Sequence, residues 1–282
     1  MLRRKQGKGQ PIRDDGPEAH SAKSGTPTMG GLLILSALVF STVMWARLDN
    51  NYVIIVLFVT ICFGGIGFID DYLKVSRQNP KGVSSKIRLL SGFFVAAVAA
   101  YFISIMHPEA LQNRLALPVF KNLLIDLGFL FVPFAIIVIL GSANAVNLTD
   151  GLDGLAIMPV MIAAGALGII SYAVGRVDFT EYLDVHYVNG TGEILILCSG
   201  IFGAGLGFLW YNAPPAAVFM GDTGSLALGG ALGAIAVVTK HELVLAIAEA
   251  AQNIVKHGYK DIENTTDKMQ IRISLKSGEL EI

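Results

Sequence analysis

The chain has 282 residues, of which 53% are hydrophobic and only 15% are charged, and its mean hydropathy is +0.60. Soluble globular domains carry about 25% charged residues. The composition therefore excludes a disordered chain, a small disulfide-stapled domain and an ordinary water-soluble enzyme, and it indicates an integral membrane protein. The net charge is −1. The two cysteines, Cys62 and Cys198, each lie within an apolar run, so we interpret them as buried apolar side chains.

The apolar residues gather in long, uninterrupted runs. A membrane-spanning helix needs roughly 20 mainly apolar residues. Six runs meet this requirement, a seventh is shorter, and an eighth begins at Leu243 but stops after Ile247. Because strands of a membrane barrel would alternate between apolar and polar residues, we predict an all-α fold, a polytopic transmembrane helical bundle with seven to eight spans. In chain order, the first seven predicted spans are 29–45, 52–69, 89–106, 123–141, 155–174, 194–211 and 225–238.

The loops between the predicted spans alternate between two sides of the membrane. One side carries 11 Lys and Arg residues, and the other carries four. The positive-inside rule therefore places the more basic side in the cytoplasm. Segment 1–28 is polar and lacks the apolar core of a signal peptide. The more basic side comprises 1–28, 70–88, 142–154 and 212–224, and the other side comprises 46–51, 107–122 and 175–193.

Two adjacent carboxylates, Asp70 and Asp71, follow the second predicted span. Charges at a membrane boundary are costly unless something compensates them. Lys74 lies four residues after Asp70 and therefore on the same helical face. This pattern indicates a phosphate-binding cation beside a metal or proton site. The alternative for the Asp pair alone is a solvated helix end.

The next loop on the basic side contains Asn147, Asp150 and Asp153 but no basic residue. On a helical turn, residues three apart face the same way. A hard cation such as Mg²⁺ prefers oxygen ligands of this kind and keeps water molecules for a phosphate partner. Helix capping is the alternative, because Asp before Gly also suits turns.

A third loop carries Asp222 between Gly221 and Gly224, where the backbone can turn sharply and approach a ligand closely. The alternative for Asp222 is a simple helix N-cap. Segment 23–31 combines a lysine with glycines and hydroxyl residues, which can bind an anion through backbone N–H groups or simply begin a helix. Because the acids of three separate loops are predicted on one face, we favour a shared site over unrelated structural roles.

Four motifs in this order resemble the phospho-N-acetylmuramoyl-pentapeptide transferases, a branch of the polyprenyl-phosphate N-acetylhexosamine-1-phosphate transferases. They read GTPTMGG at 25–31, FIDDYLK at 68–74, NAVNLTDGLDG at 144–154 and FMGDTGS at 219–225. The resemblance runs from about Gln10 to Ile247. In the related N-acetylglucosamine branch, an acidic residue tends to stand where Lys74 is, so this branch is the second choice.

The resemblance implies a reaction at the boundary between membrane and cytoplasm. Phospho-N-acetylmuramoyl-pentapeptide would pass from its UDP conjugate to undecaprenyl phosphate, releasing UMP and giving the first lipid intermediate of peptidoglycan synthesis. The expected cofactor is Mg²⁺, and the expected location is the bacterial inner membrane, with the active site on the cytoplasmic face. The expected partners are UDP-N-acetylmuramoyl-pentapeptide, undecaprenyl phosphate and the lipid bilayer, with a homodimer considered and no nucleic acid.

The resemblance also assigns residues by motif. Asp222 would be a direct Mg²⁺ ligand, and Asp70 and Asp71 would orient or deprotonate the lipid phosphate, with direct attack preferred over a covalent intermediate. Phe219 would stack on the uracil ring. The expected catalytic residues are Asp70, Asp71, Lys74, Asn147, Asp150 and Asp222, and the expected substrate-binding residues are Lys23, Thr28, Asp153, Asn212 and Phe219.

The sequence departs from the family at both ends. The family has further spans and a loop with consecutive histidines, whereas the histidines here are scattered. We therefore expect a truncated chain with three regions: a cytoplasmic N-terminal segment (1–28), a transmembrane transferase domain (29–247) and an atypical polar tail (248–282). A catalytically inactive remnant that still binds nucleotide or Mg²⁺ is one alternative. An ion-coupled transporter is less favoured, because its acids would lie near mid-span.

Overall fold

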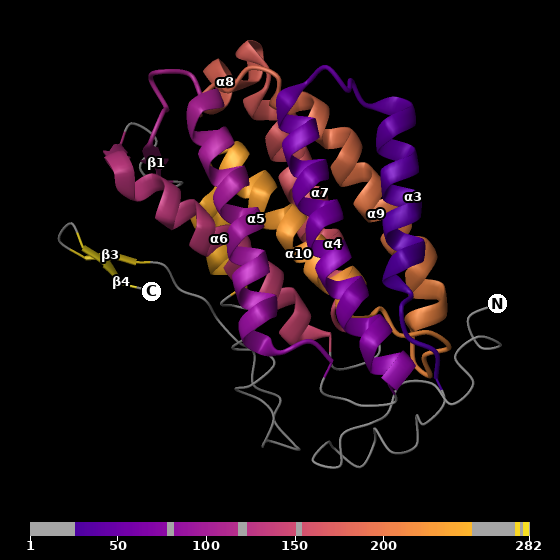
Figure 1. The fold of residues 1–282 in the computed structure, drawn as a ribbon. Coiled ribbons are helices and arrows are strands. Elements are labelled where there is room, and N and C mark those ends of the chain that lie inside the picture. The colour runs from indigo at the N-terminus through magenta and orange to yellow at the C-terminus, as the bar shows by residue number, and fades with distance from the viewer. Residues whose placement is uncertain are drawn as a thin grey trace. The chain divides into compact units, whose positions relative to one another are not determined.

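The computed structural model describes residues 26–77, 82–117, 123–150 and 154–249, together with two short strands near the C-terminus. Most of the described residues are helical (Figure 1). Within the described part of the chain, six helices are long and apolar enough to cross a membrane, and a further apolar helix is shorter. The prediction of an all-α polytopic bundle is therefore confirmed.

The elements follow the apolar runs of the sequence in order. The helices assigned to the bundle are α3 (Gly31–Trp45), α4 (Asn51–Arg77), α5 (Ser85–Met106), α6 (Phe131–Thr149), α7 (Ile157–Val174), α9 (Ile194–Asn212) and α10 (Gly221–Val238). The short elements between them are β1 (Arg114–Ala116), β2 (Leu124–Asp126), η1 (Gly128–Leu130), α8 (Val177–Leu183) and η2 (Thr191–Glu193). The chain divides into two units, Met1–Ala246 and Ile247–Ile282, and the second contains the antiparallel strands β3 (Ser274–Lys276) and β4 (Glu279–Glu281).

The predicted span at 123–141 is wrong in its position. Residues 124–126 instead pair antiparallel with 114–116, so Asp126 lies on a small sheet outside the helix. The Asp126 carboxylate accepts a hydrogen bond from the Gly128 N–H at 2.8 Å, which closes a turn before α6 begins. Hydropathy alone does not register such a turn, because the residues around it are apolar.

The helices α4 and α10 are longer than their apolar runs. α4 continues to Arg77 and therefore carries Asp70, Asp71 and Lys74 on a helix, not in a loop. α10 begins at Gly221, so Asp222 lies in its first turn.

The central helix of the bundle is α10, of which 89% of the residues are buried, whereas the corresponding share in the other candidate spans is 33–50%. Its glycines allow this burial, since they leave room for neighbouring helices to pack closely. A Cβ atom added at Gly229 would lie 2.5 Å from the Ser142 carbonyl oxygen of α6, and one at Gly230 would lie 2.9 Å from the Phe63 ring of α4.

The backbones of α3, α4 and α10 touch at one end of the bundle, which we call the inner end. A Cβ atom at Gly67 of α4 would lie 2.2 Å from the carbonyl oxygen of Asp222. A Cβ atom at Gly31 of α3 would lie 2.2 Å from the backbone nitrogen of Gly224. These contacts admit no side chain, and they fix the first turn of α10 against the acidic end of α4.

A buried polar cluster holds the other end of α10. The Lys240 ammonium donates to the Arg114 carbonyl oxygen at 2.9 Å and lies 4.0 Å from the centre of the Phe131 ring. His107 Nε2 lies 3.0 Å from the Val238 carbonyl oxygen. Burial lowers the pKa of Lys240 to about 8 and that of His107 to about 3, and it raises the pKa of Glu242 to about 7.

We expect Gly67→Val to lower the Tm of the detergent-solubilised protein by roughly 5–10 °C, because its side chain would clash with the backbone of Asp222 and overpack the helix contact. Gly65→Val is the matched control, since Gly65 lies two residues away on the same helix with nothing within 4 Å of an added Cβ. Equal Tm values for the two variants would contradict the close contact between α4 and α10.

Candidate active site

Three carboxylates meet at the inner end. Asp70 and Asp71 come from α4 and are each 1% exposed, and Asp222 comes from the first turn of α10. One oxygen atom of each lies within 4.8 Å of the others. Gly67 precedes Asp70 by less than one helical turn, so the close contact between the helices brings these acids together.

Lys74 bridges two of the three acids. Its ammonium forms an ion pair with Asp70, as the four-residue spacing on one helical face predicts, and a second with Asp222 at 2.8 Å. Lys74 is mostly buried, so water screens these pairs less than it would on a surface.

A second cation comes from α5. The guanidinium of Arg88 lies 3.1 Å from the same oxygen of Asp222 that Lys74 contacts. Arg88 is not among the site residues that the sequence predicts. One signal was available: Arg88 directly precedes an apolar run, where a charge is costly unless it has a partner.

Asp71 holds the first turn of α10 through hydrogen bonds. Its two oxygens accept hydrogen bonds from the Asp222 N–H at 3.1 Å, the Thr223 N–H at 2.9 Å and the Thr223 hydroxyl at 2.7 Å. The first N–H groups of a helix have no partner within the helix and favour a negative charge. Asp71 therefore positions Asp222.

Gly221 makes this arrangement possible. Its φ angle is +77°, and an added Cβ would lie 2.6 Å from an Asp71 oxygen and 2.9 Å from the Thr28 hydroxyl. Thr28, a predicted substrate-binding residue, is fully buried at this point. The structure thus brings Thr28 to the acidic cluster.

Asp70 contacts the residues directly before α5. Its Oδ1 accepts a hydrogen bond from the Val83 N–H at 2.7 Å. A Cβ atom at Gly82, whose φ is +53°, would lie 2.6 Å from the same oxygen. Asp70 therefore contacts the residues that lead into α5. Arg88 lies one turn into α5, so this contact brings Arg88 toward the cluster.

The segment before α3 pairs with the segment before α10. The Phe219 N–H donates to the Pro27 carbonyl oxygen, and the Gly30 N–H donates to the Phe219 carbonyl oxygen, both at 2.9 Å. Two motifs that lie far apart in the sequence are therefore adjacent. Phe219 is half-buried beside this pairing.

The predicted substrate-binding residue Asn212 is buried and bonded within the protein. Its Oδ1 accepts from the Gly154 N–H at 3.0 Å, and its Nδ2 donates to the Val218 carbonyl oxygen at 2.9 Å. Its amide therefore braces two loops.

Two further predicted residues lie at the end of α6, and two others lie outside the described residues. Asn147 lies in the last turn of α6, and Asp150 is its C-cap residue. Within the described part of the chain, Asp150 is not one of the three carboxylates that gather at the inner end. Lys23 and Asp153 lie outside the described residues.

The arrangement suits the binding of phosphate groups. Carboxylate oxygens are preferred ligands of hard divalent cations. Lys and Arg side chains bind phosphate through charge-assisted hydrogen bonds. Both kinds of group meet at the end of a bundle of apolar helices.

Comparison with known proteins gives matches over most of the chain. Residues 53–240 match the model of glycosyl transferase family 4, and residues 23–35 match signature 1 of the phospho-N-acetylmuramoyl-pentapeptide-transferases. Proteins named phospho-N-acetylmuramoyl-pentapeptide-transferase from Ruegeria sp. (strain TM1040) and Ruegeria pomeroyi are 76% and 75% identical over 247 residues. One from Dinoroseobacter shibae is 68% identical over 248 residues. Each match covers 88% of this chain and 69% of the relative.

We expect Asp71→Asn to lower the Tm in detergent by roughly 4–8 °C, because it removes a buried charge that accepts three hydrogen bonds at the start of α10. Asp49→Asn serves as control, since Asp49 is exposed and pairs only with the neighbouring Arg47 among the ion pairs of the described residues. If both variants melt at the wild-type temperature, Asp71 does not hold α10.

Proposed function

The chain belongs to glycosyl transferase family 4 and, within it, to the phospho-N-acetylmuramoyl-pentapeptide-transferases, and on this premise we propose that it transfers phospho-N-acetylmuramoyl-pentapeptide from its UDP conjugate to undecaprenyl phosphate. The product is the first lipid intermediate of peptidoglycan synthesis, and UMP is the leaving group. An oxygen of the lipid phosphate forms a bond to the sugar-linked phosphorus. The bond to the UMP phosphate breaks, and its electron pair leaves with UMP.

The group of acids and cations at the inner end is the main support for this proposal. Phosphoryl transfer chiefly requires that the reacting phosphates be positioned and their charge be neutralised. Lys74 and Arg88 supply two positive charges beside Asp222, where the apolar helices end. One substrate is a lipid and the other a charged nucleotide, so a reaction between them needs a site at such a boundary.

We assign different tasks to the two neighbouring acids of α4. Both Asp71 oxygens are occupied by the start of α10, so Asp71 acts as a positioning residue. Asp70 is the better candidate to orient the lipid phosphate or accept its proton, because it pairs with the phosphate-binding candidate Lys74. Direct attack by the lipid phosphate is preferred over a covalent intermediate.

On the nucleotide side, we assign binding to the segment around Thr28 and to Phe219. The backbone pairing of 27–31 with 219–220 supports this assignment, since it places both motifs next to the acidic cluster. Lys23 and Asp153 remain predicted contacts of the nucleotide, and Asn147 and Asp150 remain predicted members of the catalytic group. Asn212 acts indirectly, through the two loops that it joins.

Mg²⁺ is the proposed cofactor, and the residues at the inner end fit it. Three carboxylates offer oxygen atoms within 4.8 Å of one another. The Lys74 ammonium, which contacts both Asp70 and Asp222, indicates that this group of acids accepts a positive charge. Asp222 would hold the ion, because the oxygens of Asp71 are already bonded to α10. When bound, the ion would offset the negative charge of the diphosphate.

We place the inner end on the cytoplasmic face of the bacterial inner membrane. Hydrogen bonds join the four segments that we predict on the more basic side: Thr223 donates to Asp71, Gly30 donates to Phe219, and Gly154 donates to Asn212. These loops therefore share one side of the bundle. The positive-inside rule makes that side cytoplasmic.

Lys74 favours the muramoyl-pentapeptide substrate over the N-acetylglucosamine alternative. An acidic residue at this position would face Asp70 and Asp222 and add a fourth negative charge to the cluster. Lys74 instead forms ion pairs with two of the three acids and offsets one of their negative charges.

The purified chain should release UMP from UDP-N-acetylmuramoyl-pentapeptide when undecaprenyl phosphate and Mg²⁺ are present. Asp222→Asn should reduce the rate at least about 100-fold, because it removes the charge that we assign to the metal. The assay measures UMP release with wild-type and variant protein that melt at the same temperature. Equal rates in the two proteins, or a wild-type chain that is folded but releases no UMP, would refute the proposed function.

Removal of divalent metal should abolish UMP release, and Mg²⁺ should restore it. Titration with Mg²⁺ should also raise the Tm of the wild-type protein, since a ligand that binds only the folded state stabilises it. The Asp222→Asn protein should show a smaller rise. An identical Mg²⁺ response of the two proteins would show that Asp222 is not a ligand.

A further inference from the structure

Lys74 lies between two of the three acids at the inner end. Its ammonium forms an ion pair with Asp70 of the same helix and a second, at 2.8 Å, with Asp222 of α10. The attraction between opposite charges grows as their separation falls, so a cation gains most where it contacts two carboxylates at once. The lysine therefore holds the position at which the acids of α4 and α10 together attract a positive charge most strongly.

The Lys74 ammonium and a divalent ion would need the same carboxylate. The oxygen of Asp222 that contacts Lys74 also lies 3.1 Å from the Arg88 guanidinium, so this one atom faces two positive charges. The side chains of Lys74 and Asp222 are only 12% and 15% exposed, so water screens the repulsion between cations beside them poorly. Binding of a divalent ion at Asp222 therefore requires that an ion pair of this oxygen opens.

Of the two cations, Lys74 is the one that can leave Asp222 and keep a partner. Its ion pair with Asp70 lies within one helix, whereas Arg88 pairs only with Asp222 among the ion pairs of the described residues. The lysine ammonium ends a flexible four-carbon chain, so its position can change without movement of the backbone. The backbone at Gly82 covers one side of this chain, because an added Cβ there would lie 2.9 Å from Lys74 Cε.

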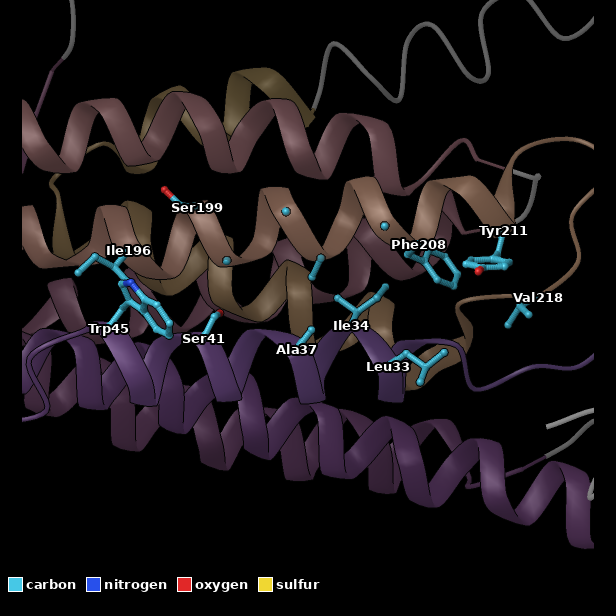
Figure 2. A pocket seen from close by; sticks show the side chains of 14 residues that line it. Leu33, Ile34, Ala37, Ser41, Trp45, Ile196, Ser199, Phe208, Tyr211 and Val218 are labelled. Carbon is cyan, nitrogen blue, oxygen red and sulfur yellow. The ribbon is translucent and has the colours of Figure 1, made fainter. Parts of the chain in front are cut away.

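A diphosphate needs positive partners, and the inner end supplies them. The cavity of about 810 Å³ between α3 and α9 is the contrasting case, because its lining, which comes wholly from the described part of the chain, contains no charged side chain (Figure 2). Charge-assisted hydrogen bonds from lysine and arginine to phosphate are roughly twice as strong as those between neutral groups. A Lys74 ammonium released from Asp222 would be free to form such bonds beside the acidic cluster.

We propose that Lys74 competes with the divalent ion for Asp222, and that binding of the ion displaces the lysine from Asp222 toward the diphosphate of the nucleotide substrate. The inference rests on the proposed function for the identity of the diphosphate, whereas the exchange at Asp222 requires only the ion. The two binding events are then coupled, because the ion releases the charge that the diphosphate uses. Lys74 thereby favours binding of the nucleotide to the protein that already holds its metal.

The test measures binding of the ion without turnover. Isothermal titration calorimetry of the detergent-solubilised full chain gives the Kd of Mg²⁺, and a second titration in excess Mg²⁺ gives the Kd of UDP. Lys74→Met removes the charge and keeps an unbranched side chain, whereas Lys74→Arg keeps the charge. Arg77→Met is the matched control, since Arg77 is exposed and lies three residues after Lys74 on the same helix.

Lys74→Met should bind Mg²⁺ about tenfold more tightly than the wild type does, and it should bind UDP about tenfold more weakly. Lys74→Arg should bind Mg²⁺ no more tightly than the wild type. Arg77→Met should bind both ligands as the wild type does, because water and salt screen an exposed charge. A lysine with a merely structural role would not move the two affinities in opposite directions.

A labelling experiment on the wild-type protein needs no variant that folds. Lysine side chains are acetylated for a short time with and without Mg²⁺, and peptide mass spectrometry measures the extent at each lysine. Mg²⁺ should increase the acetylation of Lys74, because its ammonium loses one of two ion pairs. Lys86, which is exposed in the first turn of α5, should be acetylated equally in both samples.

Equal or weaker Mg²⁺ binding by Lys74→Met, or the same gain in Arg77→Met, would overturn the proposal. So would acetylation of Lys74 that Mg²⁺ leaves unchanged, or a wild-type chain that binds no Mg²⁺. Tighter Mg²⁺ binding with an unchanged Kd for UDP would overturn the transfer of Lys74 to the diphosphate. The full set of expected changes in a chain that releases no UMP would support the exchange at Asp222 and refute the proposed function.

Discussion

The bond between Asp71 and the first turn of α10 is the interaction on which the site depends. A buried carboxylate is costly without hydrogen-bond donors, and the first N–H groups of a helix are costly without acceptors. At the inner end the Asp71 carboxylate accepts hydrogen bonds from these N–H groups, because Gly67 lets the backbones of α4 and α10 come close enough. The position of Asp222 relative to α4 follows from this contact, and the ion pairs with Lys74 and Arg88 follow from the position of Asp222.

Neighbouring acids acquire different roles because their surroundings differ. Both oxygens of Asp71 accept hydrogen bonds from α10. Asp70 accepts a hydrogen bond from Val83 and pairs with Lys74, and Asp222 pairs with two cations. The cations and the acids together form a site that can accept a charged diphosphate and a divalent ion. Because the cluster lies where the apolar helices end, the proposed reaction would bring its lipid substrate from the membrane and its nucleotide from water.

The sequence predicts those parts of the site that depend on local geometry. The pairing of Asp70 with Lys74 follows from their spacing on one helix, and the helical bundle follows from the length of the apolar runs. Other parts depend on contacts between distant segments. Nothing in an Asp–Asp pair reveals which carboxylate will cap another helix, and Asn212 offers no local sign that its amide is bonded inward at both ends. The start of α6 is not predicted correctly, because the strand and the turn around Asp126 are largely apolar, like the helix that follows.

The burial of α10 has a consequence for how the protein is made. This helix has the lowest mean hydropathy of the six candidate spans, 1.4, whereas the others range from 1.9 to 2.6. A weakly apolar, glycine-rich segment gains little from contact with lipid tails, so its place in the bilayer comes from the helices around it. In chain order it follows all of those helices. During synthesis the helices that surround α10 therefore enter the membrane before it, and the arrival of α10 brings Asp222 to Asp70 and Asp71.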